Sequence, residues 1–88
     1  MNISNNNYYL LEAILPGLRE FVRIKQANDL IDEDEEIYSM CELISELGEK
    51  DNVVIQGHVH VLNIDMKRAA TEVEIQWCKK QLRNYQLK

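Results

Sequence analysis

The chain has 88 residues, of which 15 are acidic and 10 are basic, so its formal net charge at neutral pH is -5. This length predicts one domain, because two domains would each be too small to bury a sufficient core. It also excludes large folds such as a βα barrel, which needs about 200 residues or more. With 45% hydrophobic and 28% charged residues, the composition is typical of a folded, water-soluble protein. We therefore expect a single domain over residues 1–88, with residues 1–6 flexible.

The sequence carries no pattern that would send it to or across a membrane. No apolar run approaches the roughly 18 residues of a membrane span, and residues 1–7 lack the Lys or Arg that begins a secretory signal. We expect a cytoplasmic protein without a membrane partner. Two cysteines, Cys41 and Cys78, are too few for a disulfide framework, so we expect buried thiols on helices.

The N-terminal part of the chain predicts helix. Asn5–Asn7 could cap a helix that begins at Tyr8, because apolar residues then recur at positions 8, 11, 14 and 15. Pro16-Gly17 interrupts this pattern, since proline removes a backbone donor, and a helix resumes to about Ala27. The alternation around Val22 leaves a strand over Phe21–Lys25 as the alternative.

The middle of the chain gives the clearest helical pattern. A turn is expected at Asn28-Asp29. After it, apolar residues recur at steps of three and four, which predicts an amphipathic helix over about 33–47; they are Ile37, Met40, Cys41, Ile44 and Leu47. Gly48 stands where a left-handed residue ends a helix.

The C-terminal part predicts one strand region and one helix. Asp51-Asn52 is expected to turn the chain into a β-branched, alternating run over about 53–64. Gly57 is either a bulge in one strand or part of a tight Gln56-Gly57 hairpin turn. Asp65 is the expected cap of a long helix over about 66–86. The fold class that follows is α+β: a small, helix-rich single domain with one strand or short hairpin and a long C-terminal helix.

The strand over 53–64 needs a partner, because backbone donors and acceptors must be satisfied and an isolated hairpin is marginal in water. The partner could be the N-terminal arm, the segment near Phe21 or the same strand of a second copy. Since association is a common remedy for a small core, we expect a homodimer. A self-assembling structural subunit, in which this strand drives association, is an alternative function.

The acidic residues are concentrated in one segment. From Asp29 to Glu49 there are nine acidic residues and no basic one, and six of the nine lie between Asp29 and Glu36. Such a segment repels nucleic acid and attracts a basic protein surface. With Tyr38 as a contact aromatic, the candidate partner-binding residues are Asp29, Asp32, Glu33, Asp34, Glu35, Glu36, Tyr38, Glu42 and Glu46.

A plainer interpretation is that these acids only solvate a helix face or favour its N-terminus. They could also pair with basic residues of the last helix region, within one chain or across a dimer; these are Lys67, Arg68, Lys79, Lys80 and Arg83. Ion pairs formed with these bases would neutralise the acidic segment and end its role as a docking surface.

His58-x-His60 is the only arrangement that resembles a metal motif. Residues two apart on a strand point the same way, so both rings could meet one metal ion, with Asp65, Cys41 or Cys78 as a third ligand. Ordinary surface histidines are the alternative. The sequence has no phosphate-binding glycine motif and no nucleophile motif, so we expect no catalytic residues, no cofactor and no enzyme.

These patterns favour a non-catalytic protein-binding module. We expect an inhibitor or regulator that docks the acidic segment on a basic partner, such as the nucleic-acid-facing surface of an enzyme, without binding nucleic acid itself. Proteins of phage or mobile elements that block host enzymes are one setting for such a role. The alternatives are the self-assembling subunit and a small metal-binding protein that uses His58 and His60.

Overall fold

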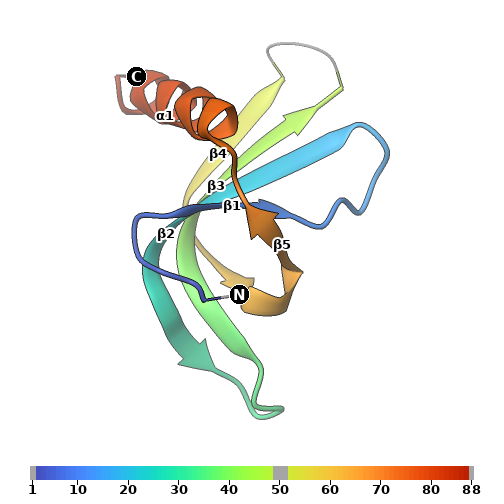
Figure 1. The fold of residues 1–88 in the computed structure, drawn as a ribbon, viewed down its shortest axis with the longest axis vertical. Helices are drawn as coiled ribbons and strands as arrows, with labels where there is room; N and C mark the ends of the chain where they lie inside the picture. Colours follow the sequence, from blue (N-terminus) through green and yellow to red (C-terminus); the bar gives the residue numbers. More distant parts are fainter. Residues whose placement is uncertain (1, 49–51, 88) are drawn as a thin grey trace.

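The fold is one five-stranded antiparallel sheet followed by a C-terminal helix (Figure 1). It is seen in a computed structural model that describes residues 2–48 and 52–87. The sheet has the strand order β4-β3-β2-β1-β5, so β4 and β5 are its edges. The elements in chain order are β1 (Tyr8–Leu11), β2 (Leu18–Ile31), β3 (Ile37–Leu47), β4 (Val53–Leu62), the 3-10 helix η1 (Asn63–Asp65), β5 (Met66–Ala69) and α1 (Glu72–Gln86).

The expectation of a helix-rich domain is wrong, although the fold is α+β. The helix predicted over 33–47 is β3, and the helices predicted over 8–27 are β1 and β2, which extend well beyond the alternative strand at Phe21–Lys25. The helix predicted over 66–86 begins only at Glu72, because the chain first adds β5 to the edge of the sheet. The strand predicted over 53–64 is confirmed as β4.

The misleading pattern in β3 arises because the middle of the sheet is buried on both faces. On one face Cys41 belongs to a cluster with Val22 and Ile24, and on the other face Ile44 packs with Phe21 and with α1. A strand that is covered on both faces loses the alternation of apolar and polar residues. The apolar positions that remain in β3 then happen to recur at helical spacing.

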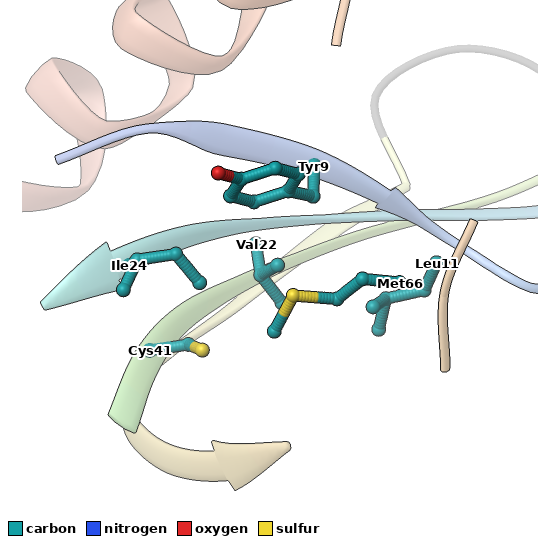
Figure 2. Close-up of a cluster of buried hydrophobic side chains, with 6 residues drawn as sticks. All are labelled: Tyr9, Leu11, Val22, Ile24, Cys41 and Met66. Carbon is teal, nitrogen blue, oxygen red and sulfur yellow. The ribbon is translucent and has the colours of Figure 1, made fainter. Parts of the chain in front are cut away.

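Two hydrophobic clusters therefore form the core, one on each side of the sheet. The first lies under α1, where Cys78 and Leu82 of the helix pack on Phe21, Ile44 and Tyr8. The second is enclosed where the sheet curves and β5 approaches β1 (Figure 1). Its members are Tyr9, Leu11, Val22, Ile24, Cys41 and Met66, and Figure 2 shows the Met66 side chain lying between Val22 and Leu11.

Two expected irregularities take different forms in the sheet. The bulge at Gly57 is confirmed, because Gly57 and His58 of β4 both lie opposite the single residue Glu42 of β3. The turn expected at Asn28-Asp29 is wrong, since β2 continues to Ile31. Asn28 instead lies in an irregular stretch where the register with β3 shifts, and its φ of 53° is left-handed. In the expected Asp51-Asn52 turn, Asp51 lies outside the described residues.

The start of α1 is fixed by hydrogen bonds that tie it to β5. Thr71 caps the helix, and its hydroxyl and the Glu74 carboxylate satisfy each other's backbone N–H groups in a capping box. Asp65, the expected cap, belongs to η1 instead. Both terminal nitrogens of Arg68 donate to Glu74, at 2.7 and 2.9 Å. These bonds, led by those from Arg68, hold the pKa of Glu74 at about 2, well below its ordinary value.

Neutralising Glu74 should weaken the fold at neutral pH but not in strong acid. Because the folded-state pKa is lowered, the charged carboxylate contributes stability above its ordinary pKa, and this contribution is lost as pH falls toward about 2. Glu74→Gln should therefore unfold at lower urea concentration than the parent at pH 7. The urea unfolding midpoints of Glu74→Gln and the parent should converge as the pH falls. The matched variant Glu72→Gln should lower the midpoint less at pH 7. A difference for Glu74→Gln that is independent of pH would contradict this account.

Candidate partner-binding hairpin

Most of the predicted partner-binding residues lie together at the turn that joins β2 to β3. The two strands continue as a ribbon past the core and curve away from α1 (Figure 1). We call residues 29–38 the hairpin end. Leu30 and Ile31 pair there with Tyr38 and Ile37, and the loop between the strands holds the acidic run. The structure brings seven of the nine candidates to this hairpin end: Asp29, Asp32, Glu33, Asp34, Glu35, Glu36 and Tyr38.

Asp32 shapes the loop. Its Oδ1 accepts the backbone N–H groups of Asp34 and Glu36, at 2.9 and 3.0 Å, and its Oδ2 accepts the Tyr38 hydroxyl at 3.0 Å. The Glu36 amide and these other donors keep the pKa of Asp32 below its ordinary value, and the bond to Asp32 raises the pKa of Tyr38. The loop also needs a left-handed residue at Glu35, with φ of 62°. Asp32 and Tyr38 therefore hold the turn together.

The four other carboxylates of the loop are exposed; they are Glu33, Asp34, Glu35 and Glu36. Within residues 2–48 and 52–87, no Lys, Arg or His lies within ion-pair distance of these four. The loop thus collects negative charge at the tip of a narrow ribbon, where solvent-facing charges produce a strong local potential.

The remaining acidic candidates are engaged within the sheet. Asp29 Oδ2 lies 2.8 Å from His60 Nε2, within hydrogen-bond distance. Glu42 and Glu46 pair across the strands with Arg23 and Arg19, respectively. Glu42 is nearly buried, so it cannot present its charge to a partner. Neither Glu42 nor Glu46 lies at the hairpin end.

The sequence does contain the signal for these cross-strand pairs. Arg19 and Arg23 are four residues apart, as are Glu42 and Glu46, and an antiparallel register that aligns one pair aligns the other. A helix over 33–47 has no such register with Arg19 and Arg23, so the predicted helix gave no sign of these pairs.

Exposed hydrophobic residues also lie at the hairpin end, and the sequence interpretation missed them. Ile31 and Ile37 are 63% and 39% exposed, and they lie directly opposite each other, so they share one face of the ribbon. Leu30, on the other face with Tyr38, is 47% exposed. The helix predicted over 33–47 places Ile37 on its buried face, and no predicted element includes Leu30 or Ile31. Side by side with the free carboxylates, they give the hairpin end an apolar and acidic surface.

The structure brings only part of the proposed metal site together. His58 and His60 are neighbours on β4, with ring centroids 6.4 Å apart, and His60 is engaged by Asp29. Among the described residues no group of three or more His, Cys, Asp or Glu side chains is placed to hold a metal ion. Cys41 and Cys78 are buried free thiols in the two separate hydrophobic clusters. Burial raises the pKa of each thiol to about 12, which makes them weak nucleophiles and ligands at neutral pH.

Comparison of the chain with models of known families, with curated proteins and with solved structures gives no match. Over the described residues, the helices are all too short or too polar to cross a membrane. The candidate site therefore rests on the geometry and chemistry of the hairpin end alone.

Replacing Asp32 should loosen the hairpin end without unfolding the sheet. Asp32→Ala removes the acceptor for two backbone amides and one hydroxyl, so the amides of Asp34 and Glu36 should exchange with solvent much faster. Hydrogen exchange followed by NMR measures this directly. The control is Asp34→Ala, which removes an exposed carboxylate from the same loop. Unchanged exchange at Asp34 and Glu36 in the Asp32 variant would show that the bonds do not order the loop.

Proposed function

We propose that the protein is a non-catalytic binding module, an inhibitor or regulator that docks its hairpin end on a basic surface of a partner protein. The observation that carries this proposal is the group of four exposed carboxylates, which have no described Lys, Arg or His within ion-pair distance and are flanked by exposed Ile31 and Ile37. A basic groove that otherwise holds nucleic acid is the kind of partner surface we favour. Direct binding of nucleic acid through the hairpin end is disfavoured, because phosphates would be repelled.

The two kinds of side chain at the hairpin end have complementary effects on binding. Exposed carboxylates accelerate encounter with a basic surface, and salt screens them. They contribute little affinity on their own because they remain solvated. Burial of apolar surface contributes about 25 cal/mol per Å², so the isoleucines can stabilise the complex that the charges guide.

The charge of the hairpin end lies far from the cations of α1. The exposed cations of α1 are Lys79, Lys80 and Arg83. The helix and the hairpin end lie at opposite ends of the long axis (Figure 1), which extends 38 Å. This separation exceeds the Debye length of about 8 Å at physiological ionic strength. The cations of α1 therefore do little to offset the negative tip in solution. We further propose that the protein acts in the cytoplasm, as an inhibitor of the kind that phages or mobile elements encode.

Neutralising the loop should reduce capture of a basic partner. Glu33→Gln with Asp34→Asn removes two charges from the loop while leaving the Asp32 hydrogen bonds in place. Glu12→Gln with Glu72→Gln removes the same charge from exposed positions away from the hairpin end and serves as the matched control. In affinity capture from a cell lysate, basic proteins retained by the parent should be reduced several-fold by the loop variant only. Their retention should also fall as salt rises.

Equal recovery with both double variants, or retention that does not respond to salt, would contradict electrostatic docking through the hairpin end. Reading both variants in the same lysate separates a local effect of the loop from a general effect of net charge.

Self-association through β4 is a second candidate function, favoured by the character of this edge. β4 has ten residues and no Lys, Arg, Asp or Glu, and among the described strands it pairs only with β3. The opposite edge, β5, has four residues that include Lys67 and Arg68. Long, uncharged edges readily pair with another chain, and edge lysines oppose this. Antiparallel pairing of β4 with β4 of a second copy would give the expected homodimer and a continuous sheet.

A charge on this edge should oppose such pairing. If β4 forms the dimer, light scattering at micromolar concentration should give twice the chain mass for the parent and the chain mass for Gln56→Lys, which places a lysine on exposed β4. Gln86→Lys, at the exposed end of α1, should leave the dimer intact. A monomeric parent, or a dimer that both variants retain, would contradict pairing through β4.

A further inference from the structure

A cleft opens on the side of the hairpin end that carries Ile37. It has a volume of about 560 Å³ and lies between the hairpin and the segment formed by η1 and the start of β5. Its apolar lining comes from Ile3, Ile37, Ile64 and Met66, and its polar lining consists of asparagine side chains. Neither lysine nor arginine is among the lining residues that the structure describes.

The cleft is continuous with the second hydrophobic cluster. Met66 is buried in that cluster, and Ile3 packs against it. Toward solvent, the apolar surface continues through Ile37 to Ile31, which lies directly opposite it on β2. Ile64, at the other side of the cleft, is 80% exposed. The cleft thus reaches the buried cluster at Met66, and Ile3, Ile37 and Ile64 complete its apolar lining.

Hydrogen bonds hold the two walls of the cleft at a fixed separation. The backbone N–H of Asn28 donates to Ser39 Oγ at 3.0 Å, and the Ser39 hydroxyl donates to Asn63 Oδ1 at 2.7 Å. Asn63 Nδ2 then donates to Asn28 Oδ1 at 2.7 Å, which closes a ring between the hairpin and η1. Ser39 is fully buried beneath this ring. A cleft whose walls are fixed in advance loses little conformational entropy when it is filled.

We propose that this cleft binds an apolar side chain of a short, basic segment of the partner protein. This inference rests on the proposed function and specifies the partner's chemistry. The apolar lining fits an aliphatic or aromatic side chain, and Glu36 immediately precedes Ile37 at the opening. Lysine or arginine residues that flank the bound side chain would therefore face the loop carboxylates Glu33, Asp34, Glu35 and Glu36. The absence of cations from the described lining disfavours a phosphate or carboxylate ligand.

Two synthetic peptides of equal length and charge test the inference. One alternates lysine with leucine and phenylalanine, and the other alternates lysine with serine. Binding of each labelled peptide is measured by fluorescence anisotropy. The two cleft variants are Ile64→Ser, in the cleft lining, and Ile31→Ser, on the apolar surface that continues from Ile37; both positions are exposed, so the replacements should leave the fold intact. The matched control is Val73→Ser on α1, since Val73 is 80% exposed like Ile64.

We expect the apolar peptide to bind about tenfold more tightly than the serine peptide, and Ile64→Ser and Ile31→Ser to remove most of this difference. Val73→Ser should bind as the parent does. The loop variant with Glu33→Gln and Asp34→Asn should weaken both peptides.

If the two peptides bind equally and both cleft variants bind like the parent, the cleft inference is overturned while docking through the loop charges stands. If Val73→Ser loses as much affinity as Ile64→Ser, the apolar contact is not at the cleft and the inference also fails. If the loop variant leaves both peptides unaffected, the proposed function fails separately. If neither peptide binds at any accessible concentration, both proposals are overturned.

Discussion

Burial of the central strands on both faces of the sheet is the constraint on which the rest of the structure depends. Adjacent residues of β2, Phe21 and Val22, are both fully buried, one under α1 and the other in the second cluster. A small chain buries a limited share of its surface. Covering both faces of the sheet lets the two long strands β2 and β3 bury apolar side chains on each side. The helix α1 covers one of those faces, and side chains of β1 and β5 complete the cluster on the other.

The candidate site is the part of β2 and β3 that extends past this double coverage. Past Asn28 and Ser39 the coverage of the ribbon ends, and Leu30, Ile31 and Ile37 are exposed to solvent. The ring of hydrogen bonds around buried Ser39 fixes the base of the ribbon, and Asp32 fixes its turn. The exposed carboxylates and isoleucines are therefore presented on an ordered element. Order of this kind reduces the entropic cost of binding.

The sequence allowed some of this structure to be predicted, for identifiable reasons. β4 is a solvent-facing edge and retains its alternation, so its strand was found. β3 is covered on both faces, and its apolar residues recur at helical spacing. The sequence therefore predicted neither the strand nor its ion pair between Glu42 and Arg23 of β2. The clustering of acidic residues at 29–36 can be seen in the sequence whatever fold the segment takes. The roles of Asp32 as a turn former and of Ile31 and Ile37 as surface residues depend on strand register, which local spacing does not specify.

The placement of the two cysteines has a consequence for covalent chemistry. Because Cys41 and Cys78 belong to clusters on opposite faces, the sheet itself stands between their sulfur atoms. A disulfide requires the two Cα atoms to lie within about 7 Å with their side chains converging. An oxidant therefore cannot cross-link the native chain to itself. A disulfide-linked product would therefore come from molecules in which at least one face of the sheet had lost its cover. The cysteine that reacts with a thiol label would identify that face.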